Sequence, residues 1–167
     1  MRMENLNEQI RQCRKCRLWK CASNAVPGEG PVDAKVMLVG QNPGREEDKV
    51  GRPFVGRSGR FLDKMLTQKG INRKELFITS VVKHASPNNR KPLQDEIDAC
   101  LPYLIIQLQI IKPKIVVLMG VVAMQTPRIA EIEYFKTVHP SAAMRFKKME
   151  NRFAQDLEVL ANRLHEC

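Results

Sequence analysis

The sequence lacks any apolar run approaching the ~20 residues that a bilayer-spanning helix requires. Its start, MRMENLNEQIRQ, is typical of a polar helix and has no apolar centre like that of a signal peptide. Low-complexity segments, internal repeats and Ser/Gly linkers are absent as well. These absences argue against a membrane protein, a secreted protein and a chain of tethered domains. We therefore expect a cytoplasmic protein with one domain over residues 1–167.

The composition is that of a globular, basic protein. The 167 residues, 43% of them hydrophobic, are enough to build a real core. Lys and Arg number 28 against 18 Asp and Glu, which gives a net charge of +10. Such an excess favours a polyanion such as nucleic acid as the partner, although a merely basic surface would give the same number.

Hydrophobic periodicity predicts alternating strands and helices. Three near-continuous apolar runs rich in branched side chains are typical of strands buried on both faces, and a weaker run predicts a fourth strand. Amphipathic helical patterns lie between and after them. This alternation predicts an α/β fold with three α/β/α layers and a central, mostly parallel four-stranded sheet. The expected strands are residues 35–40, 76–82, 114–120 and 134–139, and the expected helices are residues 58–70, 92–113 and 145–166.

Unusual segments follow three of the expected strands. In folds of this class, ligands bind beyond the carboxyl ends of the strands. The segments GQNPG, KHASPNNRKP and HPSAAMRF fall there, and the first opens the glycine-rich stretch GQNPGREEDKVGRPFVGRSG, residues 40–59. An ordinary turn needs one or two glycines, whereas this stretch has more and also contains the apolar PFVG. Glycines allow main-chain amides to approach a ligand where a Cβ would collide, so we expect a binding site here.

These segments, with CRKC near the start and Cys100 downstream, resemble the family-4 uracil-DNA glycosylases, which are iron–sulfur members of the uracil-DNA glycosylase superfamily. The resemblance covers nearly the whole chain in order, and EED-x2-GRPFVG is its most specific part. It implies a base excision repair enzyme that flips uracil out of DNA and hydrolyses its N-glycosidic bond. The implied partner is uracil-containing DNA, and we expect a monomer. No motif identifies a sliding clamp or another repair protein as a partner.

The resemblance implies catalytic roles for three side chains. His139 of the HPS motif would donate a hydrogen bond to uracil O2 as negative charge develops on the leaving base. Asn42 would position the attacking water, because an amide cannot take a proton. Its GxNPG context resembles the mismatch-specific and single-strand-selective branches of the superfamily. Glu47 matches an acidic family position, with a solvated carboxylate in a charged run as the alternative.

The base pocket is expected to contain Gly40, Gln41, Phe54 and Ser80. Phe54 would lie against the flipped base, where stacking contributes ~1–3 kcal/mol, unless it is a plain core residue. Ser80 stands where the family has an Asn that reads uracil, and a hydroxyl cannot present both groups of an amide at once. Hypoxanthine, xanthine and mismatched thymine therefore remain alternative substrates. A non-catalytic, cluster-bearing DNA-binding module is a further alternative. No lysine in the catalytic motifs suggests a Schiff base, so a monofunctional enzyme is expected.

The cysteines imply a metal centre. Cys13 and Cys16 resemble the first pair of family-4 cluster ligands, Cys100 matches the fourth, and His84 stands where the third Cys is expected. Three thiolates and one imidazole can hold a 4Fe–4S cluster. Zinc is the alternative, because one CxxC pair with distant ligands does not distinguish the two metals. Cys21 and Cys167 match no ligand position, and Cys167 is expected at a frayed terminus.

DNA contacts are expected from two segments. In the loop SPNNRKP, Arg90 and Lys91 would hold phosphates beside the pocket. After the HPS motif, Met144 would wedge into the gap left by the flipped base, and Arg145 would bind a phosphate. Ser141 is assigned to the same surface. The alternative is that AAMRF merely starts the last helix.

Overall fold

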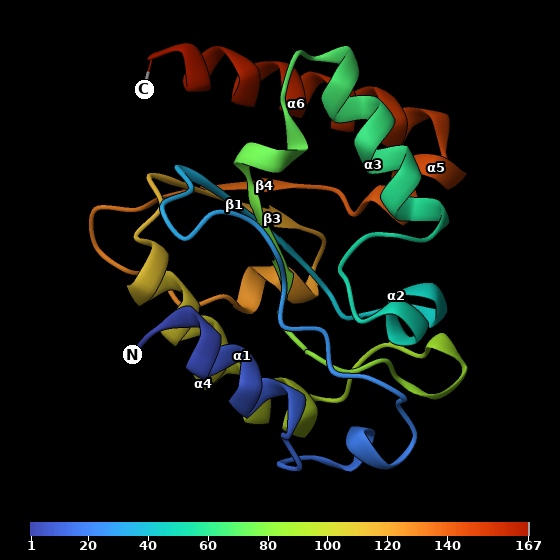
Figure 1. Cartoon of the computed structure of the whole chain (residues 1–167). Helices are drawn as coiled ribbons and strands as arrows, with labels where there is room; N and C mark the ends of the chain where they lie inside the picture. The colour runs from blue at the N-terminus through green and yellow to red at the C-terminus, as the bar shows by residue number, and fades with distance from the viewer. Residues whose placement is uncertain (167) are drawn as a thin grey trace.

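The computed structural model describes residues 1–166 and contains one parallel sheet (Figure 1). Cys167 lies outside the described residues, so its fraying stays a prediction. Every neighbouring pair in the sheet is parallel, in the order β2-β1-β3-β4. The strands are β1 (Val36–Gly40), β2 (Phe77–Ser80), β3 (Ile115–Met119) and β4 (Glu133–Thr137).

Burial of the strands follows the hydrophobic pattern. All residues of β1, β2 and β3 are buried. Of the two edge strands, β2 and β4, only β4 is partly exposed, and this exposure accounts for its weaker apolar signal. β2 ends at Ser80, two residues before the end of the predicted strand. The chain turns there, and the amides of Val81 and Val82 donate to the carbonyls of Gly40 and Gln41. Both valines remain buried, so the apolar run outlasts the strand.

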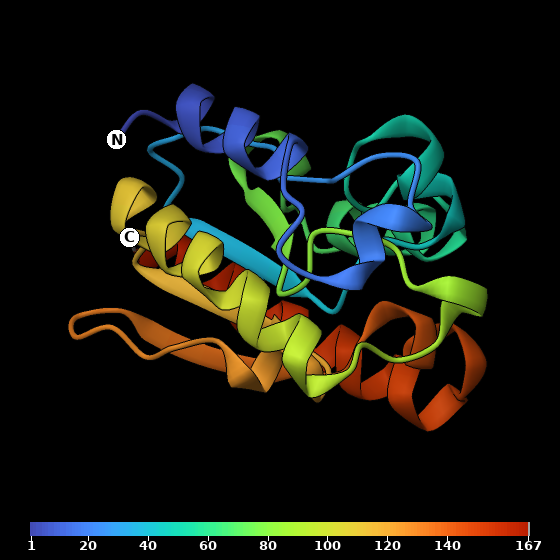
Figure 2. The same ribbon diagram turned by 90° about the horizontal axis from the view of Figure 1, so that it is seen from below.

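Helices cover both faces of the sheet, which confirms the three-layer prediction. One face is covered by α1 (Met3–Arg11) and α4 (Gln94–Ile111), which lie beside each other (Figure 2). The other is covered by α3 (Arg57–Gln68) and α6 (Lys147–Glu166) (Figure 1). Each face has its own cluster of buried apolar side chains. In the described part of the chain, no helix is both long enough and apolar enough to span a membrane.

Two short helices were not predicted, and both lie at the carboxyl end of the sheet. α2 (Arg45–Val50) forms within the glycine-rich stretch, and α5 (Pro140–Arg145) follows β4. Phe146 has extended dihedral angles and separates α5 from α6. The prediction of a helix over residues 145–166 is therefore wrong at its start, because Arg145 ends α5 and α6 begins only at Lys147. The alternative that AAMRF starts the last helix is wrong for the same reason. Single 3-10 turns occur at Arg17–Lys20, Arg73–Glu75, Pro87–Asn89 and Val122–Gln125.

Candidate active site

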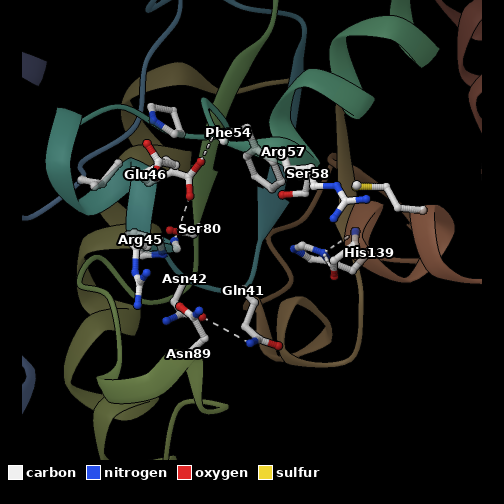
Figure 3. A pocket seen from close by; sticks show the side chains of 18 of the residues that line it. Gln41, Asn42, Arg45, Glu46, Phe54, Arg57, Ser58, Ser80, Asn89 and His139 are labelled. Carbon is white, nitrogen blue, oxygen red and sulfur yellow. Dashed lines mark hydrogen bonds between the residues drawn. The ribbon is translucent and has the colours of Figure 1, made fainter.

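A cavity of about 690 Å³ opens at the carboxyl end of the sheet, beside α2 and α5. Figure 3 shows its labelled side chains arriving from the ends of β1 and β2, from the glycine-rich stretch and from the HPS segment. Gly40 lies behind this lining, where a Cβ would come within 2.7 Å of the Phe54 ring. The cavity unites most of the predicted site residues: Gln41, Asn42, Glu47, Phe54, Ser80, His139, Ser141, Met144 and Arg145.

The His139 imidazole is held in a defined orientation at the start of α5. Its Nδ1 accepts a hydrogen bond from the Ser141 amide at 3.1 Å and lies 2.8 Å from the Ser141 hydroxyl. Although one edge of the ring faces the cavity, the surrounding protein desolvates it and lowers the pKa of His139 to about 4, against a smaller opposing effect of Glu47. The ring is thus neutral at pH 7 with its proton on Nε2. Ser141, predicted to contact DNA, orients this ring.

The Asn42 amide is held from both ends. Its Nδ2 donates to the Ser86 hydroxyl at 3.0 Å, and its Oδ1 accepts from Gln41 Nε2 at 3.2 Å. The Ser86 hydroxyl in turn donates to the Arg90 carbonyl. These contacts fix which end of the amide is the oxygen, and that oxygen keeps a lone pair for a further donor such as water.

Glu47 braces the glycine-rich stretch from within. Its carboxylate accepts hydrogen bonds from the amides of Gly44 at 3.0 Å, Val55 at 2.9 Å and Gly56 at 2.6 Å, and the residue is only 9% exposed. The alternative interpretation of Glu47 as a solvated carboxylate is therefore wrong. These bonds tie the first turn of α2 to the PFVG segment, so the side chain shapes the wall of the cavity that it also lines.

The end of β2 is fixed by a buried lysine. The Lys83 ammonium donates to the Ser80 carbonyl at 2.5 Å, to Thr79 Oγ1 at 2.7 Å and to Gln107 Oε1 at 2.8 Å. Burial lowers the pKa of Lys83 to about 7. The Ser80 hydroxyl donates to the Val82 carbonyl at 2.7 Å, so its own hydrogen is already engaged. Ser80 consequently offers the cavity an acceptor and no free donor.

The loop after β2 differs from the prediction. Arg90 and Lys91 do not line the cavity. The Arg90 guanidinium donates to both oxygens of Glu96 at 2.8 Å, and this contact is the main cause that lowers the pKa of Glu96 to about 2. Arg90 is thereby engaged by a buried carboxylate, which makes it a poor phosphate ligand. Lys91 is exposed, and it is Asn89 that reaches the cavity.

Sequence reasoning missed several cavity residues, including Arg45, Arg57, Ser58 and Asn89. Arg45 and Arg57 lie within the glycine-rich stretch, and both are exposed, as is Arg145. Within residues 1–166, none of these three arginines pairs with an acidic side chain. The only signal in the sequence was that these arginines lie in or beside the motifs that follow the strands.

The predicted metal ligands lie in one region away from the cavity. Burial, with smaller contributions from the nearby Cys16 and Cys13, raises the pKa of Cys100 to about 11 against the opposing effect of Lys83. Cys13 and His84 border the same hollow. The His84 Nδ1 is buried and has no hydrogen-bond partner, as expected of a nitrogen reserved for another ligand. The described side chains, residues 1–166, nevertheless form no group of three or more His, Cys, Asp or Glu placed to hold a metal ion.

Comparisons with known proteins identify the family. The model of the uracil DNA glycosylase superfamily matches residues 27–161. A type-4 uracil-DNA glycosylase of Pyrobaculum aerophilum is 39% identical over 95% of this chain and 93% of its own length. Type-4 enzymes of Sulfurisphaera tokodaii and Thermotoga maritima are 51% and 43% identical, over 71% and 73% of this chain but only 54% and 64% of their own lengths. The chain belongs to the type-4 family of the uracil-DNA glycosylase superfamily, a group of hydrolases that act on N-glycosyl bonds.

Proposed function

We propose that the cavity takes up a uracil flipped out of DNA and that the protein hydrolyses its N-glycosidic bond with water. The observation that carries the proposal is the convergence of Asn42, Phe54 and His139 on one cavity at the carboxyl end of the sheet. Each comes from a different segment, and together they supply a water ligand, a stacking surface and a hydrogen-bond donor.

The His139 ring supplies the donor that the leaving base requires. As the bond to the sugar breaks, negative charge develops on the uracil oxygens and positive charge on the sugar. A neutral imidazole whose Nδ1 is occupied by Ser141 presents Nε2–H as its donor. That group carries no charge to be desolvated when the base enters the cavity, and it meets the developing oxyanion at no cost in reorganisation.

Asn42 positions the nucleophile. Gln41 and Ser86 hold its amide so that Oδ1 can accept a hydrogen bond from a water molecule. Because an amide does not accept the proton, this arrangement suits a path in which the cationic sugar is reactive enough for a weak nucleophile. No lysine lines the cavity among the described residues, and Lys83, with its lowered pKa, is sealed in the core. A monofunctional reaction without a Schiff base fits these placements.

DNA is held at the rim of the cavity. Arg45, Arg57 and Arg145 are suitable phosphate ligands, in a chain with a net charge of +10. Met144 lines the same rim and is the apolar side chain placed to fill the gap left by the flipped base. In this proposal the protein works on DNA as a monomer.

The base specificity follows from Ser80. Since its hydroxyl hydrogen is donated to Val82, Ser80 can accept from uracil N3–H but cannot donate to O4. Hypoxanthine, xanthine and mismatched thymine therefore remain candidate substrates beside uracil. An asparagine in place of Ser80 should increase the preference for uracil, because a buried amide left without a hydrogen-bond partner penalises the binding of a wrong base.

A duplex carrying one labelled G·U pair tests the proposal. After incubation and alkali treatment, we expect a strand break at the uracil, and no break in a matched G·C duplex. Parallel duplexes with hypoxanthine, xanthine or G·T measure specificity, and Ser80→Asn should raise the preference for uracil by about tenfold. A uracil-only wild-type enzyme would exclude relaxed specificity. Intact G·U DNA that is nonetheless bound tightly would favour a non-catalytic DNA-binding module.

We further propose that Cys13, Cys16, His84 and Cys100 hold a 4Fe–4S cluster, with zinc as the alternative. The unpartnered His84 Nδ1 and the closely spaced thiols support this donor set. Without a cation, burial keeps the Cys16 and Cys100 thiols protonated, since it raises the pKa of both. Binding of a metal would deprotonate them and stabilise the fold, as thiolate ligation does generally.

Anaerobically purified protein should show the broad absorption of an iron–sulfur cluster at about 400 nm. Cys100→Ala should abolish this band, whereas Cys21→Ala should leave it unchanged, because Cys21 is exposed and outside the donor set. A colourless protein that contains zinc would show that these residues hold zinc in place of the cluster.

A further inference from the structure

The backbone of Phe54 is strained. Its φ is 48°, in the left-handed region that residues other than glycine rarely adopt. Such conformations cluster at functional sites and persist only where the surroundings impose them. The ring is buried against Gly40, and its centroid lies 5.8 Å from that of His139. The Phe54 ring therefore reaches the base cavity only with a strained backbone, and a contact from another group must stabilise that backbone.

Arg73 is that group. Its guanidinium donates to the Pro53 carbonyl at 2.7 Å and to the Phe54 carbonyl at 2.8 Å. It also pairs with Asp63 at 2.6 Å and with Glu29 at 3.5 Å, which fix the fork from the other side. Arg73 begins the 3-10 turn before β2, so the two carbonyls are anchored to the sheet.

Arg73 does not touch the base cavity. It lines a separate hollow on the other side of the PFVG segment, and Phe54 is the residue that borders both. α3 packs closely against the same segment. This close approach is possible because Gly59 lacks a Cβ, which would collide with the Phe54 carbonyl. Any influence of Arg73 on the base must accordingly pass through the PFVG segment, whose Pro53 and Phe54 carbonyls it holds and whose aromatic ring is that of Phe54.

We propose that Arg73 is a positioning residue for base stacking, which it serves by clamping the strained Phe54 backbone. The inference rests on the proposed function, since it takes the ring to be the stacking surface for the flipped base. Arginine suits this role because its planar guanidinium donates to two carbonyls and a carboxylate in fixed, coplanar directions, a geometry that the tetrahedral ammonium of lysine does not reproduce.

A double-mutant cycle tests the proposal. Arg73→Gln should slow single-turnover excision from the G·U duplex by about tenfold. In a Phe54→Ala background, the same change should slow it less than about twofold, because the ring that Arg73 positions is gone. An equal loss in both backgrounds, or no loss in the wild type, would show that Arg73 does not act through Phe54. Arg52→Gln is the matched control, since Arg52 pairs with Glu29 in the same hollow but contacts neither carbonyl.

A second readout does not depend on activity. The chain has three histidines, so the imidazole proton resonances can be assigned with a His139→Gln variant. Arg73→Gln should shift the His139 resonance through the displaced Phe54 ring current, and Arg52→Gln should not. An unchanged His139 resonance would overturn the proposal, whether or not the protein is active on uracil. Inactivity of the wild-type protein on uracil would count only against the proposed function. Arg73→Lys, which retains the pair with Asp63, replaces Arg73→Gln in both measurements if the latter fails to fold.

Discussion

Replacement of His139 by alanine is expected to lower the single-turnover rate of uracil excision by about 10²- to 10³-fold. The variant loses the Nε2–H that meets the negative charge on the leaving base, and no other histidine lines the cavity among the described residues. Binding of an uncleavable uracil duplex should weaken far less, since the donor acts mainly on the transition state. The measurement is a quenched time course with enzyme in excess over a labelled G·U duplex.

The pH dependence of the wild-type rate provides the control on the protonation state of His139. Because the pKa of His139 is lowered from 6.5 to about 4, the imidazole stays neutral as the pH rises from about 5 to 8, and we expect no rate change attributable to it over that range. If the enzyme needed the protonated ring, its rate would fall as the pH rose through this window. That outcome would contradict the neutral donor.

Replacement of Asn42 by alanine is expected to lower the same rate by about 10²-fold or more. The variant loses the oxygen that holds water near the anomeric carbon, and with it the contacts to Gln41 and Ser86 that orient this oxygen. Affinity for the uncleavable duplex should be retained. The rate is measured as for His139→Ala, with gel analysis after alkali treatment.

The matched control for Asn42 is Asn5→Ala, an asparagine change at an exposed position of α1. It should leave excision and DNA binding unaltered. A near wild-type rate for Asn42→Ala would remove Asn42 from the water-positioning role and transfer attention to the other polar side chains of the cavity.

Most of the fold was predictable because burial dictates it. The three branched apolar runs became the three fully buried strands, and the weaker run became the edge strand β4. α2 escaped prediction because it is a single polar turn whose stability comes from Glu47 and its contacts to the backbone, not from an apolar stripe. The break at Phe146 likewise leaves the helical periodicity almost intact, so the pattern of side chains does not reveal it.

The site was predictable where residues end a strand or closely follow one. Asn42, Ser80 and His139 meet because the carboxyl ends of parallel strands share one edge of the sheet. Arg45, Arg57 and Asn89 were missed because only the folded path of the loops brings them to the cavity. Arg90 was assigned to DNA since a basic residue in a loop usually contacts solvent, and a buried Glu96 six positions later gives no signal in the sequence.

The carboxylate of Glu47 has a consequence for how such proteins can be engineered. It staples the chain just after β1 to the chain just before α3, so residues 40–59 carry their own internal bracing. A segment braced in this way is a unit to exchange between relatives, provided that the exchange also carries Ser86, which orients the water-holding amide, and Arg73, which holds the aromatic wall. The opposite wall, at His139, belongs to a different part of the chain and would stay behind.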